Sequence, residues 1–217
     1  MQRPTHSNTP FDAAMFEVCG HRYADLSEAD YGIALLNDCK YGYSCRGSTL
    51  SLSLLRSPKS PDPSCDMGHH SFRCGIYAHT GGSVHTGQVV KACHLFNSPV
   101  LSLMKTAAEG LKSNVSGDVL TRGLVSIVEM NVGLTIDAVK FSEDGLGYAL
   151  RLVETGGTRG RATVEAAFSV QNAQQLNLSE SIGEKLQWDA KLSVLSDNRF
   201  TINYEPFKII TVYFPFD

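Results

Sequence analysis

Short stretches of alternating hydrophobic and polar residues are the dominant pattern of this chain. In Thr49–Leu55, the leucines at 50, 52 and 54 fall on one face and the serines fall on the other, as in a half-buried strand. Four later stretches repeat this alternation. Their apolar positions are Phe72, Cys74, Ile76 and Ala78; Tyr148, Leu150 and Leu152; Val164, Ala166, Phe168 and Val170; and Phe200, Ile202 and Tyr204. Short strands at this spacing predict β-sandwiches rather than βαβ units.

Turn residues and two weaker patterns divide the chain further. Asp197–Asn198 predicts a tight turn between strands, and Glu143–Gly145 predicts a hairpin turn. Short helices are predicted around Gln88–Leu95 and Leu103–Leu111. The segment Lys105–Arg122 holds several Gly, Asn and Ser residues without a clear period, so we expect a loop or domain boundary there.

Composition and charge exclude several classes of protein. The chain has 217 residues, a hydrophobic content of 42% and a net charge of −3, with a pI near 6.2. These values give no basic surface for nucleic acid or an anionic membrane. No apolar run approaches the roughly 20 residues that a membrane span needs. The opening residues MQRPTHSN lack the apolar core of a secretory signal.

Six cysteines are spread over the first half of the chain. Since most lie in apolar, strand-like contexts, we interpret them as buried free thiols in a reducing compartment. A metal site is a second interpretation of the thiols and imidazoles between residues 65 and 85. These are Cys65, His69, His70, Cys74, His79 and His85. Their spacing matches no paired Cys or His ligand pattern, so we expect no dedicated metal site.

A proline-rich loop follows the strand Thr49–Leu55. Arg56 leads into the sequence SPKSPDP, whose three prolines fix the path of the backbone. Arg56, Asp62 and Asp66 could together hold a polar ligand on this stiff loop. The alternative is that Arg56 pairs with Asp62 or Asp66 and only braces the loop.

A second candidate lies at Asn37, Asp38 and Lys40, in the sequence NDCKYG. Asn and Asp favour turns because their side chains bond to nearby backbone groups, and Gly42 tolerates positive φ. A purely structural turn is the favoured interpretation, and lining a substrate cleft is the alternative.

Several long motifs resemble those of the cytosolic (neutral) alpha-mannosidases of glycoside hydrolase family 38. The motifs are RPTHSNTPFD at Arg3–Asp12, FEVCGHRYADLSEADYGIALLNDCKYGYSCRG at Phe16–Gly47, EDGLGYALRLVETGGTRGRAT at Glu143–Thr163 and YEPFKIITVYF at Tyr204–Phe214. The similarity is dense up to about Gly81 and sparser afterwards. Cys74 and Ala78 stand where the family has Tyr and Pro, which weakens residue-level transfer in that strand.

The resemblance implies an all-β fold in two parts. Residues 1–104 would be the end of a large galactose-mutarotase-like β-supersandwich, residues 105–122 a linker, and residues 123–217 a small immunoglobulin-like β-sandwich. In the family, an arginine on the equivalent loop reaches toward the sugar cleft, and Arg56 is the matching position. The resemblance also implies that Arg3, His6 and Asn8 make hydrogen bonds at a domain interface.

The implied function is that of the C-terminal portion of an alpha-mannosidase, which supports the cleft but is not catalytic alone. The family binds zinc, or cobalt in some relatives, on an N-terminal catalytic domain whose signature motif is absent from this chain. We therefore expect that domain and a mannose-containing oligosaccharide as partners, a cytoplasmic location, no nucleic acid and no membrane. A homo-oligomer remains open. The alternative is a stand-alone carbohydrate-binding or structural β-sandwich module.

Overall fold

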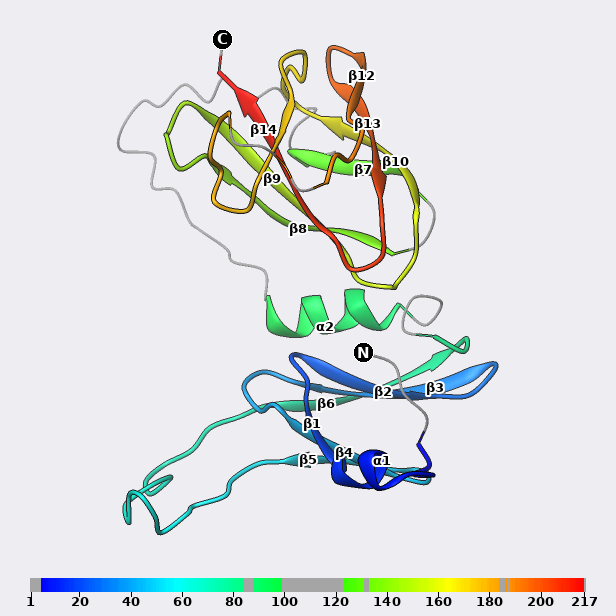
Figure 1. The fold of residues 1–217 in the computed structure, drawn as a ribbon, viewed down its shortest axis with the longest axis vertical. Coiled ribbons are helices and arrows are strands. Elements are labelled where there is room, and N and C mark those ends of the chain that lie inside the picture. The colour runs from blue at the N-terminus through cyan, green and yellow to red at the C-terminus, as the bar shows by residue number, and fades with distance from the viewer. Residues whose placement is uncertain are drawn as a thin grey trace, which may run out of the picture. The chain divides into compact units, whose positions relative to one another are not determined.

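The computed structural model describes residues 5–83, 88–98, 123–130, 133–183, 186 and 188–216. The chain divides into two compact units, Met1–Met104 and Lys105–Asp217, called unit 1 and unit 2 below. Strands dominate both units (Figure 1). The fold class is therefore all-β in two parts, as the sequence predicted. No helix in the described ranges is long and apolar enough to cross a membrane.

In its described residues, unit 1 contains two three-stranded antiparallel sheets and two helices (Figure 1). One sheet has the order β1-β4-β5, with bounds Glu17–Cys19, Gly42–Arg46 and Thr49–Ser53. The other has the order β2-β3-β6, with bounds Tyr23–Ser27, Tyr31–Asn37 and Cys74–Thr80. The helices are α1, Pro10–Ala14, and α2, Val89–Asn97.

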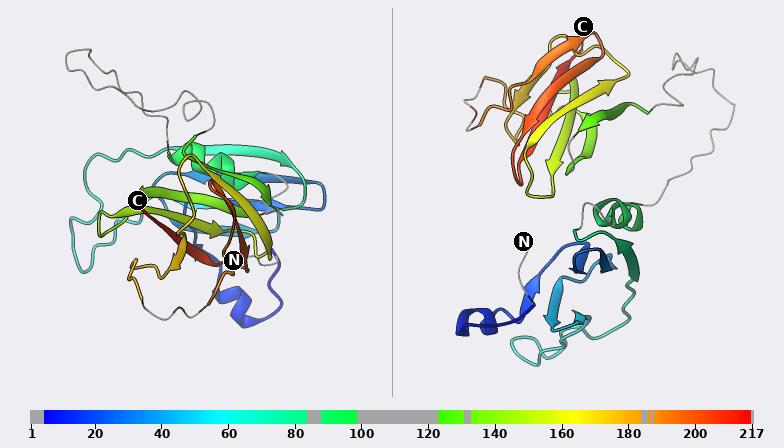
Figure 2. Two further views of the ribbon diagram at one scale, coloured as in Figure 1. Left: turned by 90° about the horizontal axis from the view of Figure 1, so that it is seen from above. Right: turned by 90° about the vertical axis from the view of Figure 1, so that its right-hand side faces the viewer.

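Helix α2 covers one face of the β2-β3-β6 sheet (Figure 2). Val89 and Cys93 of α2 form a buried cluster with Ala34 and Leu36 of β3. The helix that the sequence predicted at Gln88–Leu95 is thereby confirmed. The second predicted helix, at Leu103–Leu111, and the predicted linker at 105–122 lie outside the described residues.

The buried face of β6 is not the apolar one. The apolar alternation led us to expect the face of Phe72, Cys74, Ile76 and Ala78 to be buried, but Cys74, Ile76 and Ala78 are exposed, with Ile76 81% exposed. His79 on the other face is buried. That face carries Gly75, Tyr77 and His79, and α2 packs on it: Tyr77 lies against the cluster that α2 forms with β3, and the Phe96 ring of α2 lies beside Gly75.

Unit 2 is a sandwich of two four-stranded antiparallel sheets. One has the order β12-β13-β10-β7, with bounds Ser193–Ser196, Arg199–Tyr204, Gly160–Ala166 and Val125–Met130. The other has the order β11-β14-β9-β8, with bounds Gln174–Leu176, Ile209–Pro215, Gly147–Glu154 and Leu134–Phe141. Their inner faces share one core, which includes Leu150, Leu152, Val164, Phe200, Ile202, Ile210, Val212 and Phe214. These are mostly the alternating positions that the sequence singled out.

The two units differ in how much apolar surface they bury, and we expect them to differ in resistance to proteases. Among the described residues, the buried cluster has four members in unit 1 and fourteen in unit 2. The larger core should slow local opening and hence cleavage. Limited trypsin digestion is expected to cut between Lys105 and Arg122 and to leave unit 2 as the lasting fragment in mass spectra. Survival of unit 1 with loss of unit 2 would contradict this.

Candidate functional site

The turn after β3 is built around the side chain of Asn37. Asn37 is buried, and its Oδ1 accepts a hydrogen bond of 2.7 Å from the Lys40 amide. Its Nδ2 donates to the hydroxyl of Tyr43 on β4. Asn37 thus uses both ends of its amide to fix the turn and to join the two sheets of unit 1. This contact agrees with the structural interpretation of the turn.

Asp38 holds the chain that returns from the proline-rich loop. Its carboxylate accepts a hydrogen bond from the backbone N–H of Arg73 at 3.0 Å. It accepts a second one from Nε of the Arg73 side chain at 3.2 Å. The Arg73 amide, followed by the Cys39 thiol, lowers the pKa of Asp38 below its usual range. Arg73 also donates to the Phe96 carbonyl at 3.3 Å and lies 5.1 Å from that ring centroid. Asp38 therefore connects the turn, the loop and the last turn of α2.

Lys40 lies beside the same returning segment. Its Nζ is 5.4 Å from the centroid of the Phe72 ring, a cation–π distance. The turn and the returning segment are thus joined by two adjacent contacts, Lys40 with Phe72 and Asp38 with Arg73. Sequence reasoning missed Arg73, because its partner in the chain is 35 positions away.

The carboxylates of the loop bind the loop's own backbone. Asp66 accepts the Ser57 amide at 2.9 Å, which closes the loop at its base. The amides of Ser57 and Arg56 lower the pKa of Asp66. Asp62 accepts the Ser64 amide at 2.9 Å. Both carboxylates therefore have a structural use and are poor candidates for direct sugar ligands.

The Arg56 side chain is presented to solvent. Within the described residues, its guanidinium forms no ion pair with Asp62 or Asp66. The predicted alternative, in which such a pair braces the loop, is thus not what the structure shows. The loop is closed instead by the carboxylate of Asp66 and the amide of Ser57. A planar guanidinium on a closed loop, without an ion pair among the described residues, suits recognition of hydroxyl pairs or carboxylates.

One member of the cysteine and histidine cluster, His85, lies outside the described residues. Among the described residues, no group of three or more His, Cys, Asp or Glu side chains could hold a metal ion. The expectation that the thiols are buried was wrong for most of them. Cys93 is buried, whereas Cys19, Cys39 and Cys74 are exposed. For Cys19 and Cys74, which lie in strands, the apolar pattern does not show which face of the strand is covered.

The N-terminal motif forms a small helix that the sequence analysis did not anticipate. Thr9 caps α1, its hydroxyl accepts the Asp12 amide at 3.2 Å, and Asp12 accepts the Thr9 amide in return at 3.1 Å. The signal was present as Thr-Pro-x-Asp, a capping box with proline at the first helical position. His6 lies in an open pocket beside this helix, together with Arg46. The backbone N–H of Asn8 donates a hydrogen bond to the Asp12 carboxylate. Arg3 lies outside the described residues.

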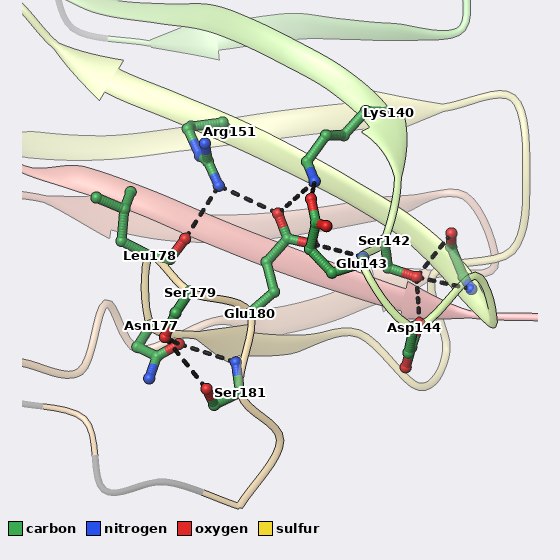
Figure 3. A network of polar contacts seen from close by, with 11 residues as sticks. Lys140, Ser142, Glu143, Asp144, Arg151, Asn177, Leu178, Ser179, Glu180 and Ser181 are labelled. Atoms are coloured by element: carbon green, nitrogen blue, oxygen red, sulfur yellow. Dashed lines mark hydrogen bonds and ion pairs between the residues drawn. The ribbon is translucent and has the colours of Figure 1, made fainter.

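Unit 2 carries a second polar network that sequence reasoning also missed (Figure 3). The buried carboxylate of Glu180 binds Lys140 at 2.9 Å, Arg151 at 3.1 Å and the Glu143 amide at 2.9 Å. Burial raises the pKa of Glu180, but these bonds outweigh it, and the net pKa is lowered. Figure 3 shows Glu180 pointing from its loop toward β8 and β9, so the network fastens that loop to the sheet. One atom of this network, Nε of Arg151, is buried and has no hydrogen-bond partner among the described residues.

Comparisons with known proteins agree with this architecture. Residues 1–64 match the "Glycosyl hydrolases family 38 C-terminal domain", and residues 133–212 match the "Glycosyl hydrolases family 38 C-terminal beta sandwich domain". The first match covers the turn and the start of the loop, and the second covers most of the sandwich of unit 2. The chain therefore belongs to glycosyl hydrolase family 38 and corresponds to its C-terminal domains.

The similar full-length proteins are alpha-mannosidases. "Alpha-mannosidase G" of Dictyostelium discoideum is 38% identical over 99% of this chain and 19% of its own length. Human "Alpha-mannosidase 2C1" is 37% identical over 98% of this chain and 19% of its own length. The Saccharomyces cerevisiae "Alpha-mannosidase" is 33% identical over 96% of this chain and 20% of its own length. The chain thus spans about a fifth of the curated relatives it matches.

Proposed function

We propose that this chain is the C-terminal, non-catalytic part of an alpha-mannosidase that removes terminal alpha-linked mannose from free oligosaccharides. The observation that carries the proposal is that nearly the whole chain aligns with alpha-mannosidases while matching only C-terminal domains of the family. The family's zinc or cobalt then lies outside this chain, on the catalytic domain. From the neutral type of the resemblance, we place oligosaccharide breakdown by the whole protein in the cytoplasm.

We expect the isolated chain to be catalytically silent. Hydrolysis with retention needs two carboxyl groups about 5 Å apart across the scissile bond. The acidic groups of the site are used instead to bind backbone amides, as Asp62 and Asp66 do. Purified chain supplied with zinc or cobalt should release no phenol from an aryl alpha-mannoside above the blank. Turnover that a chelator abolishes would contradict the proposal.

Arg56 is the residue by which this region would act on substrate. In the whole enzyme we expect Arg56→Ala to lower kcat/KM by about 10- to 100-fold, because a hydrogen bond from a charged group is worth about 1.5–3 kcal/mol. Melting should change little, because the Asp66–Ser57 contact closes the loop without the guanidinium. Steady-state kinetics and a thermal melt measure both effects.

Lys59 provides a matched control for Arg56, since it is an exposed cation in the same loop. Lys59→Ala should leave kcat/KM within about twofold, as surface substitutions away from such features usually do little. Unchanged kinetics in Arg56→Ala together with a large loss of stability would show that Arg56 braces the loop. Equal losses of kcat/KM in both variants would show that the positive charge of the loop matters, and not the Arg56 guanidinium in particular.

A stand-alone carbohydrate-binding module is the second candidate, and one observation favours it. Unit 2 presents an aromatic surface in which Phe141 and Phe216 are exposed and pack against Tyr148, with centroids 5.4 and 4.9 Å from it. Aromatic faces are a common platform for apolar faces of ligands. Titration of the chain with a mannose oligosaccharide tests this, and binding that Phe141→Ala abolishes would support the module.

A further inference from the structure

An open pocket of unit 1 lies between the segment around α1 and the turn that joins β4 to β5. Its volume is about 390 Å³, within the range of roughly 300–1,000 Å³ that is common for small-molecule sites. His6, Ser7 and Asp12 line one side, and Arg46 and Gly47 line the other. The pocket thus joins the motif at the start of the chain to the hairpin of β4 and β5.

The carboxylate of Asp12 fixes the α1 side of the pocket. Its Oδ2 accepts hydrogen bonds from the backbone N–H groups of Asn8 at 3.3 Å and Thr9 at 3.1 Å, and from the Thr9 hydroxyl at 2.8 Å. Among the described contacts, its other oxygen, Oδ1, accepts none. The Thr9 hydroxyl is the main cause that lowers the pKa of Asp12, and the nearby His6 adds to it. The helix cap therefore holds an available acceptor oxygen and an imidazole at the pocket.

The hairpin turn fixes the opposite side of the pocket. Arg46 pairs with Thr49 across the turn Gly47–Ser48, which closes β4 and β5. Gly47 has a φ of 56°, a left-handed conformation that glycine adopts without steric cost. Among the described residues, the Arg46 guanidinium forms no ion pair. Its N–H donors are thus available to a ligand from a position that the turn holds in place.

Met15 and Phe16 add an apolar surface to the pocket. β1 pairs with β4 so that Glu17 lies opposite Ser44. Continuing this register by one residue toward the N-terminus brings Phe16 beside Cys45, and both of these residues line the pocket. The side chains of Phe16 and Met15 are accessible, at 54% and 43% exposed. The pocket therefore offers an accessible aromatic ring in addition to its polar groups.

The mixture of charges in the lining determines which ligand fits. A small anion would be attracted by Arg46 but repelled by Asp12, and a small cation would be repelled by Arg46. A neutral ligand with several hydroxyl groups suits both residues, because a hydroxyl can donate to a carboxylate and accept from a guanidinium. A pyranose ring also has an apolar face, which an aromatic side chain such as Phe16 can contact. The lining therefore favours a neutral sugar over an ion.

We propose that this pocket is a binding site for a neutral pyranose, in which Arg46 and Asp12 form hydrogen bonds to hydroxyl groups and Phe16 contacts the ring. The choice of mannose as this pyranose rests on the proposed function, whereas the class of ligand rests on the lining. In the parent enzyme, the site would hold a mannose unit of the oligosaccharide without cleaving it. Hydrolysis with retention needs two carboxyl groups, and Asp12 is the one carboxylate among the described lining residues.

NMR spectra of the nitrogen-15-labelled full chain test the proposal, with methyl alpha-mannoside as the probe. We expect the amide signals of Ser7, Arg46 and Gly47 to shift until the site is saturated, with a Kd of order 1–10 mM for so small a ligand. Arg46→Gln should raise this Kd at least about tenfold, because it removes a charged hydrogen bond. Ser7→Ala, which leaves the hairpin intact, should raise it several-fold. Lys59→Gln, at an exposed cation outside the lining, should leave it within about twofold.

The same spectra identify the results that would overturn the proposal. One is that none of these amide signals shifts up to about 50 mM mannoside, where a millimolar site would be filled. Another is that inorganic phosphate shifts the signals and the mannoside does not, which would identify an anion site. Shifts confined to amides near Phe141 would place sugar binding in unit 2 instead. The proposed function is tested separately, because a whole enzyme without mannosidase activity would contradict it while saturable shifts at Arg46 would still support the pocket.

Discussion

Glu154→Gln is expected to destabilise unit 2 by about 3 kcal/mol or more, because this carboxylate is buried and organises a whole loop. Glu154 is 1% exposed. Its oxygens accept the amides of Gly156, Gly157 and Phe207 at 2.8–2.9 Å. They also accept the amide and the hydroxyl of Thr158, at 3.0 and 2.8 Å. A glutamine side chain would turn an NH₂ group toward some of these donors and leave them without acceptors.

The sole tryptophan makes this loss measurable in unit 2. Trp188 packs against the core of unit 2, so its fluorescence during urea unfolding reports on this unit. Glu143→Gln is the matched control, since it makes the same chemical change at a side chain that is 74% exposed. We expect that control to change the free energy of unfolding by no more than about 0.5 kcal/mol. Equal effects of the two substitutions would contradict the role given to Glu154.

The effect of Glu154→Gln should also depend on pH. Burial raises the pKa of Glu154, but the amides of Phe207 and Thr158 outweigh it, so the net pKa lies below the ordinary 4.5. A carboxyl whose pKa is lowered by folding contributes stability above its unfolded pKa and loses it as pH falls through the folded value. The difference between the wild type and Glu154→Gln should therefore be full at neutral pH and shrink below about pH 4.5.

The sequence predicted unit 2 better than unit 1, and burial explains the difference. In unit 2 the alternating positions, such as Leu150 and Phe200, face one continuous core, so pattern and burial coincide. In unit 1 the face of β6 with Ile76 is exposed, while α2 covers the face with His79. Local alternation identifies a strand and its two faces, but the covering element is set by tertiary packing. The same limit explains why Cys19 and Cys74, which lie in strands, are exposed although we expected them to be buried.

In the candidate site, too, some contacts could be predicted from the sequence and others could not. The turn at Asn37 could be predicted, because an Asn side chain bonds to the backbone a few residues away. The pairing of Asp38 with Arg73 could not, since it joins residues that become neighbours only when β3 and β6 pair. The proline-rich loop after Arg56 could be predicted only in part. Its prolines and charges were visible, but Asp66 was found to bind the Ser57 amide rather than the Arg56 side chain.

Gly32→Ala is expected to destabilise unit 1, because the space beside Gly32 is where the buried side chains of Asp25 and His79 bond to each other. Asp25 on β2 and His79 on β6 flank β3 and bond across it at 2.9 Å, with side chains only 6% and 2% exposed. A Cβ at Gly32 would lie 2.4 Å from Cε1 of His79 and 2.8 Å from Oγ of Ser27. The imidazole must then leave Asp25, and breaking a buried pair of this kind costs about 3–5 kcal/mol.

The buried thiol of Cys93 gives a probe for this loss, since it reacts only when α2 lifts from the sheet. A loss of about 3 kcal/mol corresponds to labelling that is roughly 100-fold faster under native conditions. A double-mutant cycle separates the clash from a general effect of alanine in a strand. His79→Ala removes the ring that Gly32→Ala would strike, so adding Gly32→Ala to it should cost much less than in the wild type. Additive losses would mean that Gly32 matters for the backbone of β3 and not for the Asp25–His79 pair.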